Sequence, residues 1–542
     1  MSKRARDDDS DSDVVDVGYV GRGRGTSIEG RVNAYAEHAR ALNVQFLKHV
    51  ERKIAQEPTA LLLSAVRDYA RYAREIRDEF QDVLAREGAM EARAETVRER
   101  ASGTVFAWGN GDSGQLGMGG DVDEKRRPAS VEYGVMENVK VLSVACGGTH
   151  TIALTSGGTC FSWGNNDGGA LGRRVDKDKN PEAEYEPGKV ELPLDVKVLA
   201  ISTGDSHGLA LAENGSVYAW GAFRTANGEW AFNPKTLDAK KTMFPFQIYT
   251  PKTQKERVKA IASGVDHALA LTQEGGVYSW GSSEKGRLGR FAESEAENNE
   301  EAGDELKRRL LTPGRVSFPT SGGAAIGSAF GGEPVMTAIV AGDFHSFAIS
   351  ANEDGSKSTV YGWGLSNCNQ LGIFDTNPDL RGDQQVTYFP KRVDCLSGRR
   401  IVSGDAGTHH SIFLTGDGKV ISVGRWTDGR CGVRVANAAV DGQLDEPREI
   451  EDLPGRVVKI TCGGTNGGAI LEDGHAYVWG SQYMGQLGLG PREEDAHLPE
   501  KLQYTKPMAG KVFSEIGFGG QHAAAVLVDE TEAGRGSKRA RA

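Results

Sequence analysis

Residues 151–164 read Thr-Ile-Ala-Leu-Thr-Ser-Gly-Gly-Thr-Cys-Phe-Ser-Trp-Gly, and this stretch decides the fold. Two short runs of β-prone residues flank Ser156-Gly157-Gly158, a pattern typical of a β-hairpin. The stretch ends on Trp163-Gly164 and is preceded by Gly147-Gly148-Thr149-His150. Both marks recur along the chain, so residues 147–164 belong to an internal repeat.

The repeat is present seven times. Its Trp-Gly mark recurs mostly at intervals of about 55 to 60 residues, with a longer interval between Trp280 and Trp363. A unit of about 55 residues with four short strands has the size of a β-propeller blade. The Trp-Gly marks begin at Trp108, Trp163, Trp220, Trp280, Trp363 and Trp479, with a degenerate copy at Val423. The Gly-x-x-His marks begin at Gly147, Gly204, Gly264, Gly342, Gly407, Gly463 and Gly519, and the sixth ends in Asn466 instead of histidine.

The two ends of the repeat region are out of phase. Its first mark is the Trp-Gly half at Trp108, and its last is the Gly-x-x-His half that begins at Gly519. Neither half makes a complete blade, so we expect the C-terminal strands to complete the N-terminal blade and remove the free sheet edges. The sequence therefore predicts an all-β, seven-bladed β-propeller over residues 101–530, closed by pairing of its N- and C-terminal strands.

The segments outside the repeats differ in character. Apolar residues spaced three and four apart over residues 31–100 predict a helical hairpin, with a coiled-coil dimerisation element as the alternative. Residues 1–30 are predicted to be a disordered basic and acidic tail, and residues 531–542 a basic tail. The basic residues of both tails predict nuclear-localisation signals, with nucleic-acid contacts or a plain solubilising tail as alternatives. These cations are Lys3, Arg4 and Arg6, then Lys538, Arg539 and Arg541.

Composition excludes several classes of function. The net charge of −11 argues against a propeller that clamps DNA nonspecifically. No apolar run approaches 18 residues, so we expect no membrane insertion. The six cysteines show no Cys-x-x-Cys spacing, and no Ser-His-Asp grouping or phosphate-binding loop is present. We therefore expect no metal site, no cofactor and no covalent catalysis.

Residues that recur in every blade are predicted to be scaffold, so function is expected where one blade differs. Asp205, Asp266 and Asp343 are acids that individual Gly-x-x-His turns carry, and we expect Asp205 and Asp266 to be solvated. His409 is an extra histidine in the fifth turn, and residues 222–232 replace the usual glycine turn with a protrusion. If the loops emerge on one face, these features share a surface suited to binding a macromolecule. The acidic run at 293–301 is predicted to be a solvated loop.

Several blade-specific segments resemble the regulator of chromosome condensation family, the guanine-nucleotide exchange factors of the GTPase Ran. The resemblance implies a protein that promotes GDP release and GTP loading of Ran by protein–protein binding alone. It covers essentially the whole propeller. The segments are Gly164–Arg173, Ser202–His207, Trp220–Arg224 with Asn227-Gly228, Gly362–Asn367, and His409-His410 leading on to Arg425.

The resemblance also implies roles for individual residues. The implied Ran-binding face comprises Asp112, His150, Asp205, Asp266, Arg290, His409 and His522. The implied wedge comprises Phe223, Arg224, Asn227 and Gly228. Thr225-Ala226 stand where the family usually has Asp-Asn, which is a departure within the wedge.

A second resemblance concerns the N-terminal extension. Residues 35–46, 66–69 and 72–76 resemble the helical segment of basket nucleoporins, whose adjacent basic N-terminus binds importin-α. The expected partners are therefore Ran, importin-α and nuclear-basket nucleoporins, and the expected location is the nucleus, at chromatin or at the pore basket. The alternative is a noncatalytic propeller scaffold that binds another GTPase, a nucleoporin or chromatin. A third reading, based on the tails alone, is an adaptor for histones or DNA.

Overall fold

The computed structural model describes residues 101–176, 178–225, 228–297, 303–319, 333–352, 354–374, 385–435 and 442–532. The predicted helical hairpin at 31–100, the basic clusters of both tails and Asn227 of the predicted wedge lie outside the described residues. No helix in the described ranges is long and apolar enough to cross a membrane. Within the same ranges, no three His, Cys, Asp or Glu side chains gather as metal ligands.

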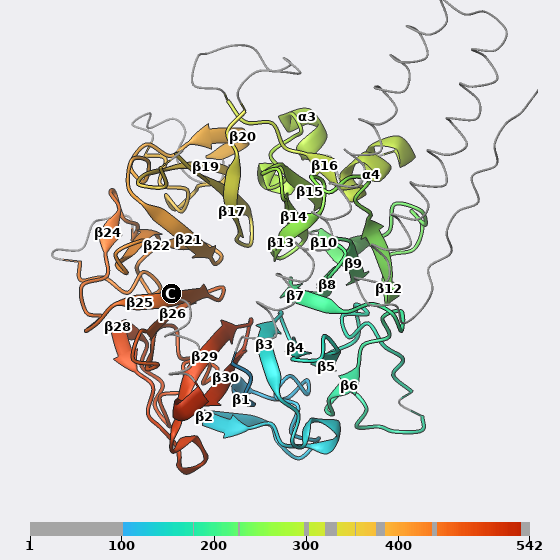
Figure 1. The fold of residues 1–542 in the computed structure, drawn as a ribbon, viewed down its shortest axis with the longest axis vertical. Helices are drawn as coiled ribbons and strands as arrows, with labels where there is room; N and C mark the ends of the chain where they lie inside the picture. Colours follow the sequence, from blue (N-terminus) through green and yellow to red (C-terminus); the bar gives the residue numbers. More distant parts are fainter. Residues whose placement is uncertain are drawn as a thin grey trace, which may run out of the picture. The chain divides into compact units, whose positions relative to one another are not determined.

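The described residues form seven four-stranded antiparallel sheets, which are the blades of a propeller (Figure 1). The innermost strand of each blade contacts the innermost strands of both neighbouring blades, so these strands form a closed ring. This confirms the predicted seven-bladed propeller.

The blades have the following bounds. The first contains β2 (Glu124–Ser130), β1 (Thr104–Asn110), β30 (His522–Asp529) and β29 (Lys511–Phe518); the second β3 (Val141–Cys146), β4 (His150–Thr155), β5 (Cys160–Gly164) and β6 (Gly188–Lys189). The third contains β7 (Val198–Thr203), β8 (His207–Ala212), β9 (Val217–Gly221) and β12 (Thr242–Tyr249); the fourth β13 (Val258–Ser263), β14 (His267–Thr272), β15 (Val277–Gly281) and β16 (Gly314–Arg315). The fifth contains β17 (Met336–Ala341), β18 (His345–Ala351), β19 (Ser358–Leu365) and β20 (Val386–Arg392); the sixth β21 (Ile401–Ala406), β22 (His410–Thr415), β23 (Val420–Gly424) and β24 (Arg448–Glu449). The seventh contains β25 (Val457–Cys462), β26 (Asn466–Leu471), β27 (Ala476–Gly480) and β28 (Ala496–Lys501), and short 3-10 turns lie at Gly134–Met136, Glu284–Gly286 and Lys506–Met508.

The ring closes as the repeat phase predicts. Strand β1, near the N-terminal end of the propeller, pairs antiparallel with β30 at its C-terminal end, from Thr104 opposite Leu527 to Gly109 opposite His522. The first blade is therefore built from both ends of the repeat region, and neither end leaves an unpaired strand in the middle of the sheet.

The tryptophans of the repeat fill the space between blades. The Trp163 side chain is fully buried, and its Nε1 donates to the Gln115 carbonyl of the preceding blade at 2.9 Å. Gly117, two residues after Gln115, has a φ of +68°. A Cβ on Gly117 would lie only 2.7 Å from Trp163 Nε1. The Gln-Leu-Gly sequence therefore needs its glycine for close contact with the indole.

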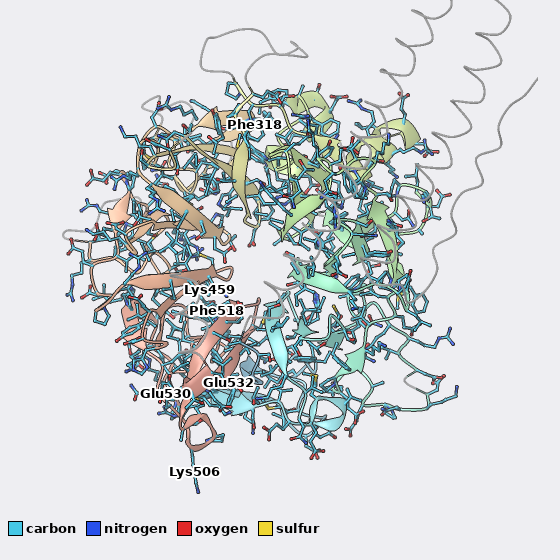
Figure 2. The ribbon with its side chains drawn as sticks, in the orientation of Figure 1. Phe318, Lys459, Lys506, Phe518, Glu530 and Glu532 are labelled. Atoms are coloured by element: carbon cyan, nitrogen blue, oxygen red, sulfur yellow. The ribbon has the colours of Figure 1, made fainter. Side chains whose placement is uncertain are left out.

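Figure 2 shows Lys459 and Phe518 near the axis of the ring and Lys506 at its outer margin.

Two kinds of loop lie on the same side of the ring. In all seven blades, the backbone N–H after the Trp-Gly mark (Val423-Gly424 in the sixth) donates to the carbonyl just before the His or Asn of the Gly-x-x-His turn. The bonds from Ala222 to Ser206 and from Ser282 to Asp266, both 2.9 Å, are examples. We call this side, made of the Gly-x-x-His turns and the loops after the Trp-Gly marks, the loop face. The protrusion at 222–232 and the turns with Asp205 and Asp266 all belong to it.

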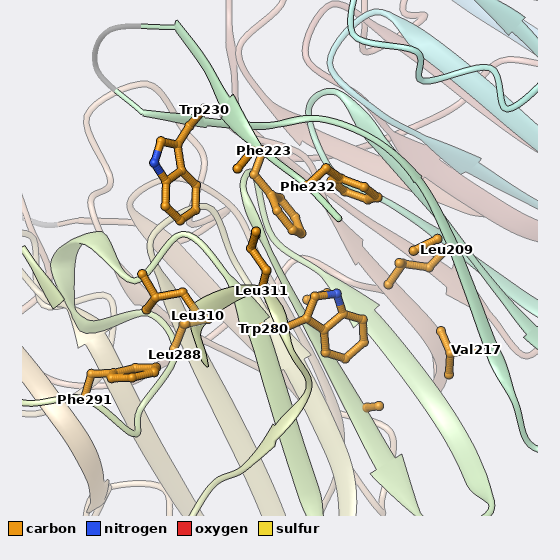
Figure 3. Close-up of a cluster of buried hydrophobic side chains, with 14 of the residues drawn as sticks. Leu209, Val217, Phe223, Trp230, Phe232, Trp280, Leu288, Phe291, Leu310 and Leu311 are labelled. Carbon is orange, nitrogen blue, oxygen red and sulfur yellow. The ribbon is translucent and has the colours of Figure 1, made fainter. Parts of the chain in front are cut away.

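The acidic insertion of the fourth blade is more ordered than predicted. It forms α3 (Glu293–Ala296) and α4 (Asp304–Leu311), joined by residues outside the described ranges. Ala296, Leu310 and Leu311 are fully buried in a cluster that also holds Phe223 and Trp230 of the protrusion (Figure 3). The predicted solvated loop at 293–301 is wrong for α3, which is helical and buries Ala296, although Glu293 and Glu297 are exposed as expected. The helix α4 lies outside that prediction.

Candidate functional site

The protrusion of the third blade is a β-hairpin outside the four-stranded blade. Strands β10 (Phe223–Thr225) and β11 (Gly228–Ala231) pair only with each other, with Thr225 opposite Gly228. Aromatic residues anchor its base: the Phe223 ring lies 4.6 Å from Phe232 and 4.8 Å from His207, centroid to centroid. The buried aromatic base gives the hairpin a fixed stem.

Two acids of the loop face hold the stem of the hairpin. Asp266 Oδ1 accepts the backbone N–H of Arg224 at 2.6 Å, across the boundary between the third and fourth blades. Asp205 Oδ2 accepts Arg224 Nη1 at 3.3 Å and the Ser206 hydroxyl at 2.9 Å. The two unusual acids and the unusual loop therefore form one constellation.

The environments of the two acids differ. The Asp205 side chain is 34% exposed, so it remains available to a partner. Asp266 is only 6% exposed, with Arg287 Nη1 3.7 Å from its Oδ2. Burial raises the pKa of Asp266 to about 7, although Arg287 and the Arg224 N–H act in the opposite direction. The expectation that Asp266 is solvated is wrong, because the hairpin stem at Arg224 and the buried Arg287 lie against its carboxylate.

Two other predicted residues also lie on the loop face. Asp112 is exposed in the loop after Trp108, where its carboxylate accepts Asn110 Nδ2 at 3.0 Å. His409 is partly exposed in the turn before β22. These positions leave both side chains accessible to a partner that covers the loop face.

Three predicted binding residues serve the scaffold instead. His150 and His522 are 1% and 0% exposed, so neither ring offers a surface to a partner. Arg290 Nη2 donates to the carbonyls of Arg309, Leu310 and Thr312 at 2.7 to 3.3 Å, and its guanidinium lies 4.3 Å from the Phe291 ring centroid. We therefore remove these three residues from the predicted contact surface. Arg173 is the equivalent scaffold residue of the second blade, where its Nη2 donates to the carbonyls of Ala183 and Glu186.

Arg287 was missed by sequence reasoning. It is fully buried, lies beside Asp266 and stands where three other blades have the glutamine of Gln-Leu-Gly. That departure from the repeat was the signal that could have identified it.

The chain resembles known proteins over most of its length. The model of the RCC1-like domain matches residues 104–525. The regulator of chromosome condensation of Homo sapiens is 34% identical over 433 residues, which are 79% of this chain and 92% of the human protein. The guanine nucleotide exchange factor SRM1 of Saccharomyces cerevisiae is 28% identical over 77% of this chain and 86% of the yeast protein.

Solved structures of a yeast relative have a similar fold. Prp20p of Saccharomyces cerevisiae, studied together with its binding properties to Gsp1p and histones, is 27% identical and has a TM-score of 0.67, with 83% of this chain and 98% of that chain covered. The same yeast protein bound to Kap60 also gives a TM-score of 0.67, with 83% and 95% covered. The family match and the human relative together establish that this chain belongs to the RCC1-like family of regulators of chromosome condensation.

Proposed function

We infer that this chain is a guanine-nucleotide exchange factor for the GTPase Ran, which promotes GDP release and GTP loading in the nucleus. The observation that carries this function is the hairpin of residues 223–231, held on the loop face against Asp205 and Asp266. Its position in the third blade matches the wedge that the family resemblance implies, and a relative named as an exchange factor aligns with 77% of the chain.

The exchange mechanism needs no covalent step. A GTPase retains its nucleotide through a phosphate-cradling loop, a lysine and Mg²⁺. A protein that binds the nucleotide-free GTPase more tightly than the loaded form lowers nucleotide affinity by the same coupling free energy. We propose that the hairpin tip between Thr225 and Gly228 inserts beside the phosphate site. The stem is already fixed on the loop face, so little binding energy is lost in ordering it.

The acids have separate roles in this mechanism. Asp205, which is partly exposed, attracts a basic side chain of the GTPase away from the nucleotide. Asp266 is buried and bonded to the Arg224 backbone, so it positions the hairpin rather than contacting the GTPase. Asp112 and His409 contribute to the surrounding contact surface.

Further partners follow from the tails and the relatives. We propose that Lys3, Arg4 and Arg6 bind the acidic groove of importin-α, and that Lys538, Arg539 and Arg541 form a second basic signal or contact chromatin. The yeast relative is known in complex with Kap60 and in binding to histones, which supports these classes of partner. Association of residues 31–100 with basket nucleoporins is a separate proposal, which rests on the sequence resemblance alone.

The exchange function is tested with Ran loaded with a fluorescent GDP. Catalytic amounts of the full chain should speed GDP release in the presence of excess GTP and leave the rate of GTP hydrolysis unchanged. Release at the spontaneous rate would favour the noncatalytic scaffold. The tails are tested by deleting residues 1–30, which should weaken importin-α binding while GDP release stays at its original rate.

A further inference from the structure

In three blades, the loop after the Trp-Gly mark satisfies its own polar groups with the glutamine of Gln-Leu-Gly. Gln115 Oε1 accepts Ser113 N–H at 2.9 Å, and its Nε2 donates to Asn110 Oδ1 at 2.9 Å. Gln370 and Gln486 likewise accept the N–H two residues before them, at 2.8 and 2.7 Å. Two blades have arginine at this position instead, Arg287 in the fourth and Arg430 in the sixth.

Arg287 extends beyond its own loop. It is 1% exposed, and its Nε donates to the Glu284 carbonyl at 2.8 Å while Nη2 lies 3.4 Å from Glu284 Oε2. Its guanidinium carbon lies 4.7 Å from the centre of the Phe344 ring in the next blade. Nη1 makes no hydrogen bond within the described part of the chain, and Asp266 Oδ2 at 3.7 Å is the counter-charge that it faces.

Asp266 transmits this contact to the hairpin. Its other oxygen accepts the N–H of Arg224, at the point where the register between β10 and β11 shifts. A shifted register leaves a strand N–H without a partner in the ladder, so the carboxylate provides the acceptor. The orientation of Asp266 therefore decides where the stem of the hairpin is held.

We propose that Arg287 is a positioning residue for nucleotide exchange, because it fixes the carboxylate of Asp266 in the orientation that holds the base of the hairpin. This role rests on the proposed exchange function. Arg287 does not contact the GTPase, since its side chain is buried. Arg287 forms a buried ion pair with Asp266, and Asp266 in turn accepts a charge-assisted hydrogen bond from the N–H of Arg224.

The role has a consequence for protonation. The charged groups that face Asp266 are Arg287, Asp205 and Glu284, and of these only Arg287 favours the ionised carboxylate. Loss of Arg287 leaves the carboxyl buried beside two acids, which raises its pKa. A larger fraction of Asp266 is then protonated at neutral pH, and a neutral carboxyl is a weaker acceptor for Arg224 N–H.

Glutamine is the informative substitution, because the equivalent loop accommodates it in three other blades. Arg287→Gln removes the cation while keeping a side chain that satisfies the loop. Arg430→Gln is the matched control, since Arg430 is also buried but bonds Asp428 in its own loop, away from the hairpin. Arg287→Lys keeps a positive charge beside Asp266.

The first measurement follows GDP release from Ran with the full-length wild type and these three variants between pH 6 and pH 8.5. Arg287→Gln should lower kcat by about tenfold or more with little change in KM, because a slightly displaced hairpin disturbs only the productive geometry. The acid limb of its kcat profile should move to higher pH. Arg430→Gln should match the wild type, and Arg287→Lys should keep the acid limb near its original pH. Equal losses in Arg287→Gln and Arg430→Gln would overturn the proposal.

The second measurement is amide hydrogen exchange over residues 222–231 in the absence of Ran. Arg287→Gln should lose protection of this segment, and Arg430→Gln should retain it. Unchanged protection in Arg287→Gln contradicts the role of Arg287 whatever the activity. A wild-type chain that fails to release GDP contradicts the exchange function itself, and with it any part of Arg287 in exchange.

Discussion

His522 Nε2 lies 2.7 Å from Thr151 Oγ1 in the neighbouring blade. The Thr151 hydroxyl donates its proton to the Gln115 carbonyl at 3.0 Å, so His522 carries a proton on Nε2 and donates it to Thr151. A histidine of a Gly-x-x-His turn therefore links two blades where the next blade has Ser or Thr directly after its own histidine. The same link joins His267 to Ser346 and His345 to Ser411, at 2.8 and 2.7 Å.

Among the boundaries that lack this link, the one between the third and fourth blades can be repaired. Both ring nitrogens of His207 are without a hydrogen-bond partner among the described residues, and Ala268 occupies the position where the linked blades have Ser or Thr. Ala268→Ser should raise the free energy of unfolding by about 1 kcal/mol, because it offers the buried imidazole a hydroxyl. Urea denaturation at pH 7.5 measures the change.

Ala523→Ser is the control for this repair. Ala523 holds the equivalent position in the first blade, but the preceding blade has Asn466, whose side chain already donates to the Ser481 carbonyl. A hydroxyl at 523 gains no histidine partner, so its burial should leave stability unchanged or lower. Equal stabilisation by the two serines would contradict the link as the cause.

The buried histidines predict a loss of stability in acid. Their folded pKa values lie below the unfolded value of about 6.5, so their contribution is complete above pH 6.5 and falls as the pH drops. Each can cost up to about 1.4 kcal/mol per pH unit below that point. Buried carboxyls such as Asp405, whose pKa burial raises to about 6, act in the opposite direction but are fewer. Burial lowers the pKa of His150 to about 4, lowers those of His207, His345, His410 and His522 to about 3, and also lowers that of His267.

His522→Asn tests this pH dependence. The sixth Gly-x-x-His mark already ends in Asn466, so the turn accommodates asparagine. The variant should lose the link to Thr151 at pH 7.5, yet its unfolding free energy should fall less steeply between pH 6.5 and pH 4.5, by about 1.4 kcal/mol per pH unit. Chemical denaturation at several pH values gives both slopes. Parallel curves for the variant and the wild type would show that His522 does not titrate on unfolding.

The number of blades and the closure of the ring could be predicted because the recurring residues pack in the same way in most blades. Trp163 illustrates this, since an indole and a glycine from the preceding loop fit together at five of the seven boundaries. The same reasoning assigned the histidines as a class to the scaffold, and the inclusion of His150 and His522 in the contact surface departed from it.

The burial of Asp266 could not be predicted from its own neighbours in the sequence. It is caused by Arg224, 42 residues earlier, and by Arg287 in the following loop. The acidic run at 293–301 was misjudged for a related reason: its charged composition conceals Ala296, which packs in one cluster with Phe223 of the hairpin far upstream. Sequence periodicity predicts the local helix or strand, whereas the contacts of Asp266 and of the insertion depend on tertiary structure.

Asp205 and Asp266 should respond differently to substitution. Asp205→Ala should depress Ran exchange with little loss of thermal stability, because the side chain is partly solvated and its pair with Arg224 is exposed. Asp266→Ala should lower exchange and also destabilise the fold by about 3–5 kcal/mol, since it leaves Arg287 buried without its facing carboxylate. GDP-release assays and thermal melts on the two variants separate these effects. Equal melting temperatures would contradict the burial of the Asp266–Arg287 pair.

Helix α4 should support exchange through the stem of the hairpin. Leu311 is fully buried in the cluster with Phe223 and Trp230, so Leu311→Ala leaves a cavity beneath the stem. Leu487→Ala removes an equally buried leucine near Trp108, in a separate cluster of the core. Each substitution should cost about 2–5 kcal/mol of unfolding free energy. Assayed well below both melting temperatures, Leu311→Ala should release GDP from Ran more slowly than Leu487→Ala, because only its cavity lets the hairpin move. Equal GDP-release rates in the two folded variants would show that the insertion stabilises the fourth blade without positioning the hairpin.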